Sequence, residues 1–232
     1  MSIEFKNPAD AVREQGIKAL VYGGAGSGKT WLLATAKEPT LLVSTEAGLL
    51  SIKDAPNTIQ IVECNTKAEV DEVLDYLNQN KLPPWVCIDS ISEIAEVVLA
   101  EELLKTKDPR KAYGELAVVM TAMIKRFRNL HTNVVMTAKL DRVKDDASGT
   151  MLYGPGMPGQ KMGQALPYFF DLVCAMRVTN NNEGDLVREL QTNRDGQWDA
   201  KDRSGKLAIF EKQSLHALAQ KILDKPQQKK AA

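Results

Sequence analysis

"GIKALVYGGAGSGKT", residues 16–30, is the stretch that decides the fold. Its first half, residues 16–23, is a short apolar run ending in glycine, which is typical of a buried strand. Its second half, "GGAGSGKT" at residues 23–30, matches the pattern G-x-x-x-x-G-K-[ST], and a helix is expected from Lys29 to about Lys37. A strand, a glycine-rich loop and a helix in this order predict a phosphate-binding loop.

The residue types of this loop suit a nucleotide. Glycines let backbone N–H groups approach phosphates, and the helix N-terminus favours an anion. We expect Lys29 to reach the β- and γ-phosphates of ATP and the Thr30 hydroxyl to ligate Mg²⁺. A chance glycine-rich turn is the alternative. The residues expected to bind the nucleotide are Gly23, Gly24, Ala25, Gly26, Ser27, Gly28, Lys29, Thr30 and, from a later strand, Asp89.

Three later strand ends carry polar side chains. "WVCIDS" ends at Asp89 and Ser90, where Asp89 is expected to hold Mg²⁺ with Thr30, or else to cap the next helix. "TLLVSTE" ends at Glu46, a candidate base for the attacking water, or simply a glutamate at a turn. "VVMTAK" ends at Lys139, which is either a γ-phosphate sensor or a solvated lysine.

The order of elements predicts the fold class. Strands and helices alternate first, with a capping box at Thr66 and Glu69 and helices expected over 91–104 and 115–130. Residues 140–166 show no period. "FFDLVCAMRV", "DLVRELQT" and "WDAKDRSGKLAIF" then read as consecutive strands. We therefore expect an α/β P-loop core with a mostly parallel central sheet, flanked by helices, and an antiparallel β extension at its C-terminal edge.

Length and composition limit the organisation and the partners. The chain has 232 residues and no internal repeat, so we expect one domain over 16–223, a candidate oligomerisation arm over 1–15 and a basic, disordered tail over 224–232. Its 30 basic and 30 acidic residues exclude a global attraction to polyanions. Three scattered cysteines argue against disulfides and predict a cytoplasmic protein, and the absence of a long apolar run argues against a membrane partner.

The phosphate loop, Glu46, Asp89 with Ser90, and Lys139 before a long glycine-rich segment together resemble the RecA-type recombinase core. The compact length and the ending "AKDRSG" are more closely similar to phage-encoded, core-only RecA-like ATPases of the Sak type. The resemblance spans about residues 16–210. It implies a DNA-dependent ATPase that uses ATP and Mg²⁺, oligomerises on single-stranded DNA and promotes homologous recombination or strand annealing, in the host cytoplasm if the chain is phage-encoded.

The resemblance also implies roles for particular residues. Glu46 would activate the hydrolytic water, and Lys139 stands where RecA proteins usually carry a glutamine sensor, a departure that puts the coupling of hydrolysis to DNA in doubt. "KTKDPRKAY", residues 105–113, and the segment 142–164 fall where the family has its two DNA-binding loops. Cations there suit a nucleic-acid backbone and aromatic rings suit its bases, although Asp145 and Asp146 oppose this. The candidate DNA-binding residues are Lys105, Lys107, Arg110, Lys111, Tyr113, Arg142, Lys144, Tyr153 and Lys161. A disordered lid without a DNA role is the alternative.

Assembly is a further implication of the resemblance. Such proteins form head-to-tail filaments or rings with ATP between neighbours. Lys201 and Arg203 are two residues apart, would share one face of a strand, and resemble a K-x-K pair of RecA proteins, so we expect them to reach the γ-phosphate of the adjacent subunit. The alternative is a solvated hairpin. Phe5 is a candidate contact with the next subunit, unless it packs on its own domain, and a single-strand-binding protein is a further candidate partner. The expected catalytic residues are Lys29, Glu46, Lys139, Lys201 and Arg203.

Two other functions remain open. One is a regulatory or scaffold P-loop ATPase that acts on protein partners without DNA, which the balanced charge fits. The other is a P-loop small-molecule kinase. A kinase predicts a mobile lid rich in arginine, whereas the long segment carries Arg142 as its only arginine.

Overall fold

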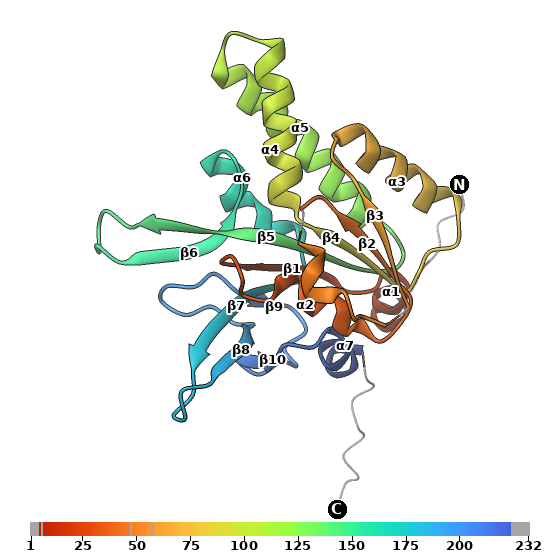
Figure 1. Cartoon of the computed structure of the whole chain (residues 1–232), viewed down its shortest axis with the longest axis vertical. Helices are drawn as coiled ribbons and strands as arrows, with labels where there is room; N and C mark the ends of the chain where they lie inside the picture. The colour runs from red at the N-terminus through yellow and green to blue at the C-terminus, as the bar shows by residue number, and fades with distance from the viewer. Residues whose placement is uncertain (1–4, 6, 47, 57, 224–232) are drawn as a thin grey trace, which may run out of the picture.

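The structure, a computed structural model, describes residue 5 and residues 7–46, 48–56 and 58–223, and the expected tail at 224–232 lies outside this range (Figure 1). Within it, one sheet has the strand order β10-β8-β7-β1-β5-β4-β2-β3, with β6 paired to β5 and β9 paired to β7. The strands are β1 Lys18–Gly23, β2 Thr40–Ser44, β3 Ile59–Glu63, β4 Trp85–Asp89, β5 Asn133–Lys144, β6 Met151–Gly156, β7 Leu172–Asn180, β8 Leu186–Gln191, β9 Lys201–Asp202 and β10 Phe210–Lys212.

The sheet confirms the predicted fold class. β3, β2, β4, β5, β1 and β7 run parallel, while β6, β8, β9 and β10 are antiparallel to their neighbours. Every residue of β1 and β4 is buried. Strands that are apolar on both faces need cover on both faces, which is why they form the parallel centre.

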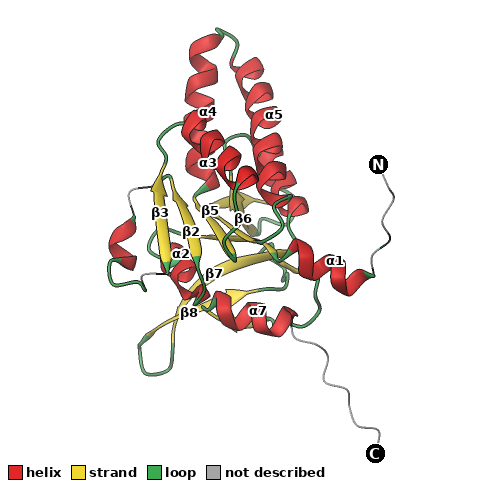
Figure 2. Cartoon of the chain, turned by 90° about the vertical axis from the view of Figure 1, so that its right-hand side faces the viewer, coloured by secondary structure: helices red, strands yellow, loops and turns green. Residues whose placement is uncertain are grey.

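Helices cover both faces of this sheet. They are α1 Pro8–Gln15, α2 Lys29–Leu33, α3 Lys67–Gln79, α4 Ile91–Lys105, α5 Pro109–Arg128, α6 Gln160–Ala165 and α7 Leu215–Leu223, with short 3₁₀ turns at 34–36, 49–52 and 166–169. Figure 2 shows α3, α4 and α5 on one side and α7 on the other. Each side has its own buried apolar cluster, one including Phe127 of α5 and the other Leu32 of α2 and Leu215 of α7. None of the described helices combines the length and the apolar character that a membrane crossing requires.

Local sequence signals account for the helix starts. Thr66 and Glu69 form the predicted capping box of α3. α5 begins at Pro109, earlier than predicted, because the Asp108 side chain accepts a hydrogen bond from the Arg110 N–H and proline suits the first turn.

Residues 140–166, whose sequence shows no period, contain regular elements in the structure. β5 continues to Lys144 and turns back through β6, with Lys139 opposite Gly156, and α6 follows. Residues 141–144 are exposed, because this hairpin projects beyond the edge of the sheet. Pro155 is buried and Tyr153 stacks on Trp198, whereas the apolar side chains of Val143 and Leu152 are exposed, so apolar residues do not alternate regularly with polar ones and the sequence gives no period.

The expectation of one strand over "WDAKDRSGKLAIF" is also wrong. β9 contains only Lys201 and Asp202, and the chain then turns until β10 begins at Phe210. The Asp202 carboxylate causes the turn, since it accepts hydrogen bonds from the N–H groups of Ser204 and Leu207.

Candidate nucleotide-binding site

The glycine-rich loop joins the end of β1 to α2 at the edge of the sheet where the parallel strands end. Only glycine fits at two of its positions. A Cβ on Gly23 would lie 2.7 Å from Ser27 Oγ and 2.8 Å from Met176 Cβ. Gly28, the N-cap of α2, has a φ of 97°, and a Cβ there would lie 2.5 Å from Gln213 Nε2. The loop is therefore tightly folded against its neighbours.

Lys29 and Ser27 turn polar groups into the loop. The Lys29 ammonium donates to the carbonyls of Gly23, at 2.9 Å, and Gly24, at 3.1 Å. Burial lowers the pKa of Lys29, and the nearby carboxylates of Glu46 and Asp89 oppose that shift. The Ser27 hydroxyl is buried and has no hydrogen-bond partner among the described atoms. An unsatisfied buried donor in the same loop as a partly buried ammonium fits a phosphate oxygen as the missing partner.

Thr30 and Asp89 are brought together as predicted. Thr30 Oγ1 donates to Asp89 Oδ2 at 2.5 Å, and Thr137 on β5 donates to Asp89 Oδ1. Asp89 is buried, and these hydroxyls satisfy its two carboxylate oxygens. A carboxylate and a hydroxyl are the oxygen ligands that Mg²⁺ prefers, and Mg²⁺ bound there would supply charge stabilisation to a phosphate. The cap of α4 is Ser90, whose hydroxyl accepts from the Glu93 N–H at 3.3 Å, so Asp89 is not the cap.

Glu46 lies at the same edge, held by the end of β4. Its carboxylate accepts a hydrogen bond from the Ser90 hydroxyl. Thr45 and Ser90 bond each other twice, at 3.0 Å each, which ties the ends of β2 and β4 together. Glu46, Lys29 and Thr30 line one cavity of about 780 Å³. This position suits a base acting on a water beside a terminal phosphate, and that role stays a prediction.

The side chain of Lys139 is 43% exposed, and its ammonium is paired with α4. Lys139 is level with Gly23 in the register of β5 and β1, and its ammonium pairs with Glu93 at 2.8 Å and Glu96 at 2.7 Å on α4. Burial acts to lower the pKa of Lys139, but the two carboxylates outweigh it and the pKa is raised. Lys139 therefore stays charged and joins β5 to α4, and its role as a sensor stays a prediction.

Sequence reasoning missed several residues of the cavity. Trp31, Arg188 and Gln213 line it together with the glycine-rich loop. Trp31 follows the motif directly, and its 47% exposure was not foreseeable from the sequence. Arg188 on β8 and Gln213 after β10 reach the loop through the antiparallel edge of the sheet, which no local pattern specifies.

Lys201 and Arg203 lie at the opposite edge of the sheet from this loop. Lys201 and Asp202 pair with the start of β7, which is level with the start of β1. Lys201 Nζ donates to the Pro167 carbonyl at 2.6 Å, and Arg203 pairs with Asp171 at 3.0 Å. We expected the two cations to share one face of a strand. β9 ends at Asp202, so Arg203 lies beyond the strand. They cannot reach the loop of their own chain.

The first candidate DNA-binding segment, residues 105–113, is the tip of a helical hairpin. Figures 1 and 2 show α4 and α5 projecting away from the sheet to this tip. Lys105, Lys107, Arg110 and Lys111 are exposed, and Lys105 pairs with Glu102 at 2.6 Å. Tyr113 is 43% exposed.

The second candidate segment contains the β5–β6 hairpin and α6. Arg142 and Lys144 are exposed on β5. One face of the Tyr153 ring stacks on Trp198 at 4.3 Å between centroids, and its role in binding a base stays a prediction. Lys161 is in α6, and its side chain lies outside the described part of the structure.

Comparisons with known proteins were made for families, curated sequences and solved structures. A family profile described as an AAA domain matches residues 15–204. No curated protein matches the sequence. Among solved structures, the KaiC-like protein PH0186 of the hyperthermophilic archaeon Pyrococcus horikoshii OT3 is similar at 18% identity and a TM-score of 0.45, over 75% of this chain and 77% of that chain. We draw nothing on activity or partners from a likeness of this size.

Changing Lys29 to Ala should weaken binding of ATP and ADP by about 10- to 100-fold, because a charge-assisted contact with phosphate is lost. Trp31 gives the readout, since it is 47% exposed in the cavity, whereas Trp85 is only 2% exposed and Trp198 stacks on Tyr153 and lines a different cavity. Nucleotide should change the tryptophan fluorescence of the native chain and of a Lys53→Ala control, but not of Trp31→Phe. Native affinity in Lys29→Ala would contradict the assigned site.

Glu46→Gln should bind ATP normally but hydrolyse it about 10²- to 10⁴-fold more slowly, since the amide cannot accept a proton from water. The glutamine oxygen can still accept the hydrogen bond from Ser90, so the fold should persist. Steady-state phosphate release measures the effect, with Glu183→Gln, on the exposed β7–β8 turn, as the matched control. Unchanged turnover in Glu46→Gln would remove Glu46 from the reaction.

Proposed function

The chain belongs to the AAA domain family, and from that premise we propose that it is an ATPase of the RecA-like Sak type that hydrolyses ATP with Mg²⁺, assembles on single-stranded DNA and promotes recombination or strand annealing. The ATPase part is supported by Lys29, Thr30, Glu46 and Asp89, which meet at one edge of the sheet. The DNA part depends on a single contact between the two cation-bearing projections.

That contact joins Tyr113 to Gly159. A Cβ on Gly159 would lie 3.2 Å from the Tyr113 ring, so the base of the helical tip touches the segment after the β5–β6 hairpin. Lys107, Arg110 and Lys111 form no ion pair with any described residue. Unpaired cations beside a half-exposed tyrosine match the chemistry of single-stranded nucleic acid, whose backbone takes cations and whose bases stack on rings.

Two elements connect this surface to the nucleotide. β5 carries Lys139 beside the glycine-rich loop and Arg142 three residues further on. α4 carries Glu93 and Glu96, which hold Lys139, and ends at the tip. A shift of Lys139 when the γ-phosphate is lost would therefore be transmitted to both projections, which supports coupling of hydrolysis to DNA.

Self-association is supported by features at two edges of the sheet. Phe5 is 93% exposed, so it does not pack on its own chain. β3 is an edge strand, and beside it Leu41, Ile61, Val73 and Tyr76 line a groove of about 560 Å³ that suits an aromatic side chain of a second copy. Arg203 lies at the edge opposite the nucleotide site, where a head-to-tail neighbour would place its own nucleotide.

One observation favours a protein partner instead of DNA. Leu104, at the helical tip, is 89% exposed, and Val118 on α5 is 65% exposed. Large exposed apolar side chains often mark protein contacts. A scaffold ATPase is therefore the second candidate function, and the DNA experiment separates the two.

Single-stranded DNA should raise ATP hydrolysis several-fold, and rising salt should reduce the effect because phosphate contacts release counterions. Combining Lys107→Ala, Arg110→Ala and Lys111→Ala should lower the salt slope of DNA binding by about 2, from about 0.7 for each phosphate contact on a single strand. Fluorescence anisotropy of a labelled oligonucleotide measures binding. The matched control replaces Lys37, Lys53 and Lys81, exposed lysines elsewhere on the surface. Intact hydrolysis with no response to DNA would favour the scaffold function.

Arg203→Ala should retain nucleotide binding but lose hydrolysis by roughly 10³-fold, as when a cation supplied by a neighbour is removed. The side chain is 54% exposed, so the core should tolerate the change. Mixing Arg203→Ala with Glu46→Gln should recover part of the activity, because some interfaces then combine an intact Glu46 with an intact Arg203. Lys201 is left unchanged, since it bonds the Pro167 carbonyl. A mixture no more active than its parts would contradict action between subunits.

A further inference from the structure

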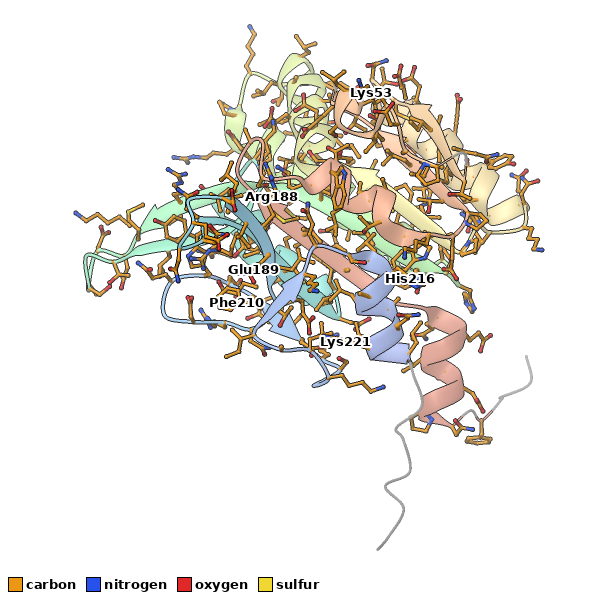
Figure 3. All side chains as sticks on the ribbon, turned by 60° about the horizontal axis from the view of Figure 1, so that its bottom comes forward. Lys53, Arg188, Glu189, Phe210, His216 and Lys221 are labelled. Carbon is orange, nitrogen blue, oxygen red and sulfur yellow. The ribbon has the colours of Figure 1, made fainter. Side chains whose placement is uncertain are left out.

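We propose that Arg188 binds the phosphates of the nucleotide from within the same chain. The proposal rests on the proposed function, since it adds a residue to the same site. Arg188 belongs to β8, far from the motif in sequence, yet Arg188 Cδ lies 3.2 Å and Nε 3.5 Å from where a Cβ on Gly28 would stand. Gly28 directly precedes Lys29 in the loop that wraps the phosphates. Figure 3 labels Arg188 on the strand that lies against this loop.

The register of the sheet places Arg188 over the loop. Side chains two apart on a strand share a face, so Arg188 lies on the same face as Leu190. Leu190 is fully buried in the apolar cluster that includes Leu32 of α2. Leu190 is opposite Met176, which touches Gly23, and Arg188 is opposite Val178, two residues further toward the loop. Burial of Leu190 beneath α2 thus fixes Arg188 above the N-terminus of that helix.

The surroundings of Arg188 leave its charge for a ligand. Among the described residues, no carboxylate lies within ion-pairing distance of its guanidinium. The guanidinium of Arg177, on the neighbouring strand, already has partners within the chain, because it lies over the Trp198 ring at 4.1 Å and donates to Gln191. Gln213 Nε2 donates to the Gly28 carbonyl at 2.6 Å and holds the loop from the same side as Arg188.

The chemistry of the cavity favours phosphate over base as the partner of Arg188. A guanidinium presents several donors in a plane and binds phosphate oxygens in pairs. Its cavity of about 780 Å³ also holds Trp31, whose exposed indole offers a better flat surface for a base. Arg188 and Lys29 would then approach the phosphates as two cations from different elements, one from β8 and one from α2.

The experiment compares Arg188→Met, which removes the charge at similar length, with Arg188→Lys, which keeps it. Arg194→Met is the matched control, because Arg194 is exposed and lies away from the glycine-rich loop. Calorimetric titration with Mg-ADP, and with pyrophosphate as a ligand without a base, gives the affinities. We expect Arg188→Met to lose about 10-fold in affinity for both ligands and Arg188→Lys to recover most of it. Thermal melting checks that each variant is folded.

Several results would overturn the assignment. Native affinity for ADP in Arg188→Met excludes any contact. A loss for ADP but not for pyrophosphate, without rescue by lysine, assigns the guanidinium to the base and contradicts a phosphate contact. If the native chain binds no nucleotide, the proposed function fails, and Arg188 fails with it. If the native chain binds nucleotide and Lys29→Ala does not, the site stands, and native affinity in Arg188→Met then overturns the role of Arg188 alone.

Discussion

The Asp89 carboxylate is the constraint on which the rest of the site depends. It is buried at the end of β4 and accepts hydroxyl hydrogen bonds from Thr30 on α2 and Thr137 on β5. A buried carboxylate without such donors costs several kcal/mol. β4, α2 and β5 are therefore held close enough for both hydroxyls to reach Asp89. The position of α2 then sets the glycine-rich loop, and the end of β4 sets Ser90, which holds Glu46.

The sequence predicted those parts of the site that local pattern determines. The loop at residues 23–30 carries its own glycines, lysine and threonine, and strand ends at Asp89 and Glu46 must meet because parallel strands end at one edge. The capping box of α3 and the parallel centre of the sheet follow from equally local signals. These predictions required only that the central strands run parallel, and not which strand pairs with which.

What the sequence could not predict depends on pairing between distant strands. Arg188 reaches the loop only because β8 pairs with β7 and β7 with β1, and the pattern of β8 says nothing of its neighbours. The β5–β6 hairpin leaves the apolar side chains of Val143 and Leu152 exposed, so it lacks the period by which strands are recognised. Lys201 lies on β9, whereas Arg203 lies in the turn that follows. The Asp202 carboxylate holds this turn through the N–H groups of Ser204 and Leu207.

β5 has 12 residues, and at about 3.3 Å for each residue it is a rod of about 40 Å. It begins at Asn133, whose side chain accepts from the Ile17 N–H near the end of the sheet that carries Arg203, passes the glycine-rich loop at Lys139, and ends in the projecting hairpin at Lys144. It pairs with β1 over residues 134–139, with β4 over residues 133–136 and with β6 over residues 139–144, so each part of it is held by a neighbouring strand. One stiff strand therefore runs from the end of the sheet near Arg203, past the glycine-rich loop at Lys139, to the projecting hairpin, so that a displacement at either end would be transmitted to Lys139.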